Sequence, residues 1–183
     1  MSGLNYKENF AMIKLMLIMT LILGGVYPFM LTVVGRVFFP FQAQGSLIQM
    51  NQQVVGSLHM GQEFISPKYF KGRPSLTHYQ TDVLQPQHLF FWGTPELSNF
   101  VALQRQQWSQ TAFVPNEMLY PSASMLDPHI SWMGGVIQLA SVAKARGMDI
   151  NDLYRFLDSY SHSKDMINVL DLNLALDKEF SHT

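Results

Sequence analysis

The sequence has no cysteine, and this absence removes several kinds of chemistry at once. A chain without thiols forms no disulfide, holds no zinc through thiolates and offers no cysteine nucleophile. Charge is also scarce, because Asp, Glu, Lys and Arg make up 14% of the 183 residues and the formal net charge is −1. Neither nucleic acid nor an acidic surface is therefore an implied partner. The length leaves room for one folded domain and an anchor.

Motifs that carry catalysis or nucleotide binding are missing as well. The sequence contains no G-x-x-x-x-G-K-[ST] phosphate loop, no G-x-G-x-x-G and no serine in a G-x-S-x-G context. Its six histidines show neither H-x-H nor H-x-x-x-H spacing, which metal sites commonly use. We therefore predict no catalytic residue and no metal ligand in this chain.

Asp127-Pro128-His129 is the most conspicuous polar group of residues. An aspartate two positions before a histidine can share a hydrogen bond with it. Asp-Pro more commonly begins a turn, since the residue before proline avoids the helical conformation. We predict a turn in which the Asp127 carboxylate accepts backbone donors. A functional contact through Asp127 and His129 stays open as the alternative.

A long apolar run occupies the first forty positions. Residues 15–34, LMLIMTLILGGVYPFMLTVV, contain no charged side chain. Twenty helical residues at about 1.5 Å each span the roughly 30 Å hydrocarbon layer. A cleaved signal peptide is disfavoured, because the run is longer than a signal-peptide core and no clear small-x-small cleavage site follows it. A buried helix of a soluble protein is also disfavoured, because this helix has no polar face and would need to be covered on every side. We predict an uncleaved transmembrane helix over residues 15–36.

Two features inside the predicted span bear on its shape and its contacts. Pro28 removes a backbone donor, which predicts a kink. The adjacent Gly24 and Gly25 make a flat, small surface that another helix can approach closely. Both glycines are therefore partner-contact candidates.

Basic residues around the span set its predicted orientation. Lys7 and Lys14 precede the uncharged run at 15–34, whereas only Arg36 follows that run closely. Because basic residues are enriched on the cytoplasmic side, we expect residues 1–14 in the cytoplasm and residues 37–183 as an exported, periplasmic domain.

Strand patterns scattered among helix patterns predict an α+β fold for the exported domain. Thr94-Pro95-Glu96 is typical of a helix start. Helical spacing places Leu97, Phe100, Val101, Gln104 and Trp108 on one side of that helix. In chain order we expect a β-hairpin within 46–62, mostly ordered loop over 65–95, the helix from 95, a short strand at 118–120, a helix capped by Ser131 and ending at Gly147, a helix capped by Asp149, a strand at 167–169, and a terminal helical turn or two capped by Asp171.

Four blocks of the sequence carry a resemblance to a known family. They are Pro40 with QAQGSLI at 42–48, then VVGSLHMGQEF at 54–64 with YFKGRPS at 69–75, then SASMLDPHIS at 122–131 continuing through Gln138 to VAKARG at 142–147, and INVLDLNLALD at 167–177. In this order behind a single span, the blocks resemble the C subunit of the Kdp potassium-transporting ATPase of bacteria over nearly the whole chain.

Two segments depart from the pattern of that family. Residues 77–95 read THYQTDVLQPQHLFFWGTP, where the family usually has a segment rich in Ser, Gly and Asn. Residues 122–125 read SASM in place of an S-G-S-G pattern. If the first of these loops normally touches a partner, that contact must differ in this chain.

The resemblance implies a non-catalytic accessory subunit of a high-affinity, ATP-driven potassium uptake system. Such a subunit is needed for assembly and is described as a catalytic chaperone that raises the ATP affinity of the ATPase subunit. The implied partners in the bacterial inner membrane are a potassium-binding channel-like subunit, a P-type ATPase subunit and a small membrane subunit. Those partners would handle ATP and potassium, since this chain lacks the D-K-T-G phosphorylation motif.

The resemblance also implies roles for particular residues. It links Gln138 to nucleotide, although the predicted orientation puts Gln138 in the periplasm, where ATP is not available, and within a helix that buries its neighbours. Arg73 of the R-P-S block joins Asp127 and His129 as a partner-contact candidate. Two other functions stay open: a signal-anchored periplasmic enzyme that uses Asp127, His129 and a nearby serine, and an envelope assembly factor unrelated to ion transport. Turnover of a substrate by the domain alone would favour the enzyme.

Overall fold

The computed structural model describes residues 6–50, 52–82, 93–109, 111–161 and 165–180. The chain divides into two compact units, Met1–Ser46 and Leu47–Thr183. The described residues of the first unit, 6–46, are almost entirely helical. Those of the second combine helices with two small antiparallel sheets, which confirms the predicted α+β fold behind one apolar helix.

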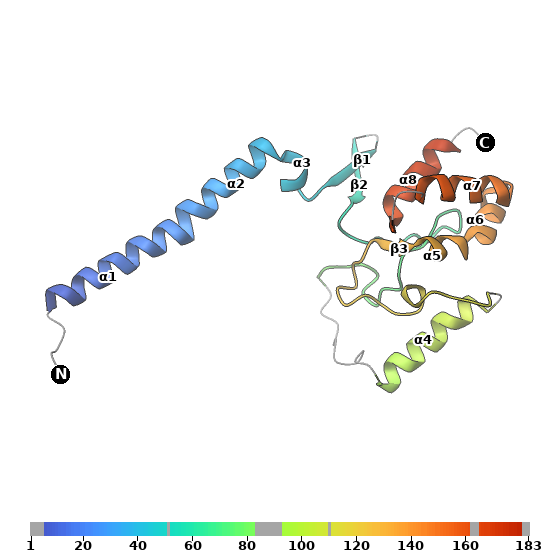
Figure 1. Ribbon diagram of the computed structural model, residues 1–183, viewed down its shortest axis with the longest axis horizontal. Helices are drawn as coiled ribbons and strands as arrows, with labels where there is room; N and C mark the ends of the chain where they lie inside the picture. The colour runs from blue at the N-terminus through green and yellow to red at the C-terminus, as the bar shows by residue number, and fades with distance from the viewer. Residues whose placement is uncertain (1–5, 51, 83–92, 110, 162–164, 181–183) are drawn as a thin grey trace. The chain divides into compact units, whose positions relative to one another are not determined.

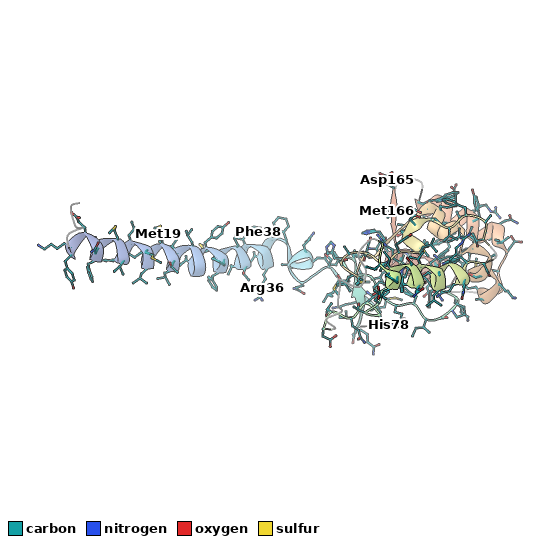
Figure 2. The ribbon with its side chains drawn as sticks, turned by 90° about the horizontal axis from the view of Figure 1, so that it is seen from below. Met19, Arg36, Phe38, His78, Asp165 and Met166 are labelled. Atoms are coloured by element: carbon teal, nitrogen blue, oxygen red, sulfur yellow. The ribbon has the colours of Figure 1, made fainter. Side chains whose placement is uncertain are left out.

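The first unit contains one apolar helix, Tyr6–Phe38, that is long and apolar enough to cross a membrane. It runs through α1 (Tyr6–Leu21), a π-helical turn η1 (Ile22–Val26) and α2 (Tyr27–Phe38). Figure 2 shows its side chains radiating on all sides, Met19 and Arg36 among them. The helix therefore includes the predicted span at 15–36 and extends beyond it at both ends.

The π-helical turn coincides with Gly24 and Gly25 and lies directly before Pro28. In the π-helical turn the Tyr27 N–H donates to the Ile22 carbonyl five residues back. A proline inside a helix lacks an N–H, and its ring clashes with the carbonyl four residues earlier. Widening the turn before Pro28 relieves that clash. The proline expected to kink the helix is accommodated by this π-helical turn.

A short helix, α3 (Pro40–Ala43), follows the apolar helix, and a β-hairpin opens the second unit. Strands β1 (Leu47–Met50) and β2 (Gln53–Ser57) pair antiparallel with a bulge between Ile48 and Gln49. The hairpin predicted within 46–62 is confirmed, and Asn51 lies outside the described residues. Residues 65–82 form turns and loops, as predicted, and residues 58–64 before them are also turn and loop. Positions 83–92 of the predicted loop lie outside the described residues.

The second sheet joins segments that are far apart in the chain. Strand β3 (His129–Ser131) pairs antiparallel with β4 (Met166–Asn168), and Ile130 faces Ile167 in the register. Both isoleucines are fully buried at the centre of the core. The core also contains Phe70, Leu153, Leu157, Leu172 and Leu176. The strand expected at 167–169 is thus confirmed, one residue earlier.

The described residues of the second unit also form five α-helices. They are α4 (Pro95–Gln107), α5 (Trp132–Val136), α6 (Leu139–Arg146), α7 (Ile150–Ser161) and α8 (Val169–Glu179). In Figure 1, α7 and α8 lie on one side of β3 and α4 lies on the other. Thr94 caps α4 through its side chain, and Leu97 is buried on the predicted inner side. Gly147 ends α6 at φ 69°, a left-handed conformation that glycine adopts without strain.

Three details differ from the predictions. Residues 118–120 are not a strand, because a 3-10 turn, η3 (Asn116–Met118), follows Pro115 and sends Met118 into the core. The helix that starts after Ser131 is divided at residues 137–138 into α5 and α6. The cap of α8 is Asn168, whose amide oxygen accepts from the Asp171 N–H at 3.2 Å, and the helix runs for 11 residues. Asn168 is the N-cap instead of Asp171 because it ends β4 in the extended conformation that an N-cap residue adopts.

Candidate functional site

An ion pair joins two of the partner-contact candidates across 54 positions of sequence. Arg73 Nη1 lies 2.9 Å from Asp127 Oδ2, and Arg73 Nη2 donates to the Pro121 carbonyl at 3.4 Å. The Arg73 and Asp127 side chains are 22% and 27% exposed. The pair therefore fastens the loop after Phe70 to the turn before β3 and still presents charge at the surface.

Asp127 also organises the turn that follows it. Its Oδ1 accepts from the His129 backbone N–H at 3.0 Å, and the Asp127 N–H donates to Ser122 Oγ at 3.4 Å. The prediction that this carboxylate accepts a backbone donor is confirmed. The His129 ring lies near the same oxygen, with Nδ1 at 3.4 Å, and its side chain is 42% exposed. Of the three candidates in this cluster, His129 is the most accessible.

Tyr79 packs beneath the cluster, against the backbone of Arg73. Its phenol donates to the Arg73 carbonyl, and burial raises the pKa of Tyr79 to about 12. Two glycines make room for the ring: a Cβ at Gly61 would lie 2.4 Å from Tyr79 Cε1, and one at Gly72 would lie 2.7 Å from its hydroxyl oxygen. The loop thus needs small residues at both positions to hold Tyr79 under Arg73.

A cleft of about 350 Å³ opens beside this cluster, between the 62–79 loop and the C-terminal half of α4. Its charged residues include Lys71 and Arg73, together with Glu63, which pairs with His78 Nδ1 at 2.9 Å. Trp108 and Met118 contribute apolar surface. Figure 2 labels His78 on this second unit. Among the described residues, no group of three or more His, Asp or Glu side chains is arranged to hold a metal ion.

Gln138 lies in a different environment from the other candidates, because it is only 2% exposed. Its Oε1 accepts from the Lys71 N–H at 2.7 Å, and its Nε2 donates to the Lys71 carbonyl at 3.1 Å and to the Gly134 carbonyl at 2.8 Å. Both amide hydrogens of the side chain therefore have partners within the chain. The structure places Gln138 as a support for the backbone of Lys71.

Asn173 does the same for the preceding residue. Its Oδ1 accepts from the Phe70 N–H at 2.9 Å, and its Nδ2 donates to the Phe70 carbonyl at 2.9 Å. Arg146 makes a third contact of this kind, because its Nε donates to the Lys68 carbonyl at 2.7 Å. The Arg146 guanidinium is in turn paired with Asp177, with Nη2 at 2.5 Å from Oδ1. We call these contacts of Gln138, Asn173 and Arg146 with residues 68–71 the backbone clamp.

The sequence contained a signal for the backbone clamp that the predictions missed. Asn173 interrupts a series of leucines in α8, LDLNLALD, on the face that Leu172 and Leu176 bury. A polar amide among buried apolar residues requires hydrogen-bond partners. Its two bonds to Phe70 meet that need. They also explain how a loop segment without strand partners stays ordered in the core.

Gly24 and Gly25 lie in open space within the described part of the apolar helix. A Cβ at Gly24 would meet nothing within 4 Å, and one at Gly25 would approach only Leu21 Cδ1 at 3.9 Å. These distances describe the chain alone and leave both positions open to a second helix.

The fold defines a class of protein: a small α+β domain joined to one helix that is able to span a membrane. Comparisons with known proteins identify the family within that class. The family described as K+-transporting ATPase, c chain, matches residues 10–178. A potassium-transporting ATPase KdpC subunit of Escherichia coli K12 is 38% identical over 173 residues, which cover 86% of this chain and 90% of the relative.

Two further KdpC subunits are similarly close. The protein of Herminiimonas arsenicoxydans is 36% identical over 88% of this chain and 92% of its own length. The protein of Shigella dysenteriae serotype 1 is 36% identical over 91% of this chain and 95% of its own length. The chain therefore belongs to the family of the K+-transporting ATPase c chain, and the resemblance predicted from the four sequence blocks is confirmed.

Proposed function

We propose that this chain is a non-catalytic accessory subunit of an ATP-driven potassium uptake complex in the bacterial inner membrane. The observation that carries the proposal is the family match over residues 10–178, which includes both the apolar helix and the domain. The relatives are named as subunits of a potassium-transporting ATPase. In this proposal a channel-like subunit binds potassium, a P-type ATPase subunit hydrolyses ATP, and a small membrane subunit completes the complex.

The apolar helix serves as the anchor in this proposal. Lys7 and Lys14 precede its most apolar stretch, which favours a cytoplasmic N-terminus and a periplasmic domain. Gly24 and Gly25 offer the surface for a partner helix, since a Cβ at Gly24 would meet none of the described residues within 4 Å. Assembly through the span would explain why an accessory subunit needs a membrane helix at all.

The domain contributes through its accessible polar cluster. Arg73, Asp127 and His129 are partly exposed, and the ion pair and the Asp127–His129 turn hold them in fixed positions. A fixed charged group of this kind suits recognition by a partner subunit, because little side-chain entropy is lost when it binds. We propose that this cluster contacts a partner and thereby supports the assembly and the ATP affinity of the complex.

We assign Gln138 a positioning role within this function. Its amide is buried and bonded to Lys71 and Gly134, so a nucleotide could reach it only if these bonds broke. Support of the Lys71 backbone explains a glutamine at this position without nucleotide, and we propose that ATP and potassium are bound by the partner subunits.

Co-purification tests the proposal. The tagged full chain, expressed with the potassium-binding and ATPase subunits, should recover both from detergent-solubilised membranes. A phosphatase reporter fused after residue 183 should be active, whereas a fluorescent reporter that needs the cytoplasm should be dark. Recovery of the chain without either subunit would contradict the accessory role, and an inactive phosphatase with bright cytoplasmic fluorescence would contradict the orientation.

A further inference from the structure

The hairpin β1–β2 belongs to an uncharged stretch that follows the apolar helix. Residues 37–62 contain no Lys, Arg, Asp or Glu. Exposed sheet edges in soluble domains commonly carry charges or prolines that keep them in water and prevent pairing. Neither β1 nor β2 contains such a residue. The hairpin therefore lacks the usual features of a strand pair that faces water.

Apolar side chains are exposed on both faces of this hairpin. Leu47 and Val54 are 40% and 56% exposed, and Met50 is 44% exposed. Val54 pairs with Gln49 in the register, so it shares a face with Leu47, whereas Met50 points to the opposite face because successive residues alternate. A protein partner packed on one face would leave the other in water. A lipid layer can surround both.

The connection to the membrane helix is short. Only eight residues, 39–46, separate the end of α2 from the start of β1, and they can span at most about 28 Å even when fully extended. Four of them form α3, which shortens the reach further. Phe39 and Phe41 in this connection are 58% and 44% exposed, so the apolar character of the helix continues toward the hairpin.

We propose that the hairpin β1–β2 lies in the interfacial layer of the bilayer, with Met50 and Val54 reaching the boundary with the acyl chains. The inward-facing backbone groups of the two strands pair with each other, and the outward-facing ones, like the side chains of Gln49, Gln52 and Gln53, can bond lipid headgroups or water in the interfacial layer. Since residues 37–62 carry no charge, this association depends on apolar contact and needs neither anionic lipid nor low salt. It fixes the hairpin at the membrane independently of the partner subunits.

The absence of cysteine makes a direct test possible. The full-length variants Met50→Cys and Val54→Cys would each be labelled with an environment-sensitive fluorophore and placed in phosphatidylcholine vesicles that contain acyl-brominated lipid. Ile65→Cys and Phe113→Cys are the matched controls, because Ile65 and Phe113 are 83% and 65% exposed in the same unit. We expect brominated lipid to quench the two hairpin labels several-fold more strongly than the controls. Added anionic lipid or salt should leave that ratio unchanged.

Three results would overturn the proposal. Quenching at positions 50 and 54 no stronger than at 65 would place the hairpin in water. Quenching that appears only with anionic lipid would indicate electrostatic surface association. Protection of the labels that requires the partner subunits would show that a protein covers the hairpin. A fluorophore at position 50 or 54 could itself disturb the hairpin. A label at Leu47→Cys, at the start of β1, provides a check, and it should also be quenched more strongly than the two controls.

Discussion

Replacing Gln138 by methionine separates a positioning role from a nucleotide-binding role. Methionine has nearly the same volume and tolerates a buried position, so Gln138→Met mainly deletes hydrogen bonds. The Lys71 N–H, the Lys71 carbonyl and the Gly134 carbonyl each lose their partner on the Gln138 side chain. A hydrogen bond contributes about 1 kcal/mol net, and a group left unsatisfied costs about 1–3 kcal/mol. Because Lys71 is only partly shielded, we expect the free energy of unfolding to fall by about 2–3 kcal/mol in total.

The assay is thermal unfolding of the full chain in detergent. For a domain of this size, a loss of 2–3 kcal/mol lowers the melting temperature by about 6–10 °C. Gln106→Met on the exposed side of α4 is the matched control and should melt within a degree or two of wild type. If both variants melted alike, the backbone clamp would not stabilise the domain. If Gln138→Met melted like wild type but lowered the ATP affinity of the assembled complex, the nucleotide role would replace the positioning role.

Three further variants test other parts of the structure. Asp127→Asn should lower the free energy of unfolding by about 1–2 kcal/mol, and the assembled complex should keep most of its potassium-stimulated ATPase activity at saturating ATP. An inactive complex that assembles and melts like wild type would contradict this. Gly24→Leu should reduce recovery of the complex in detergent more than Leu21→Ala, whereas equal recovery would mean that the glycines face lipid. Tyr79 has a folded pKa of about 12 against 10 when unfolded, so its stabilisation is present below pH 10 and is lost as the pH rises toward 12. That difference in pKa between the folded and unfolded states corresponds to at most about 3 kcal/mol. Tyr79→Phe should therefore lose less stability than wild type between pH 9.5 and 11.5 in melts at stepped pH, and parallel losses would refute the assignment.

Local sequence patterns predicted much of the fold correctly. The apolar run at 15–34 has one stable solution, a helix, because backbone groups in hydrocarbon must bond each other. Thr94, Ser131 and Gly147 mark helix ends through short-range geometry, and the structure confirms all three. These features depend on residues within one turn of each other, which a sequence displays directly.

The arrangement of the candidate site depended on contacts between distant residues. The sequence identified Asp127 as a turn residue, but the 54-residue separation hid its ion pair with Arg73. Gln138 was linked to nucleotide by resemblance, while its bonds to Lys71 depend on a loop 67 positions earlier. The prediction of a strand at 118–120 was wrong for a related reason, because Met118 lies at the end of the 3-10 turn η3 and its side chain packs into the core. Tertiary packing decided each of these cases.

Potassium-stimulated ATP hydrolysis by the purified complex tests the accessory role most directly. The complex would be prepared with this chain, without it, and with the chain added back, and the chain alone would be measured under the same conditions. We expect full activity only when the chain is present, recovery when it is added back, and no hydrolysis by the chain alone. Potassium-stimulated activity that is unchanged without the chain, or ATP turnover by the chain itself, would contradict its assignment as a non-catalytic accessory subunit.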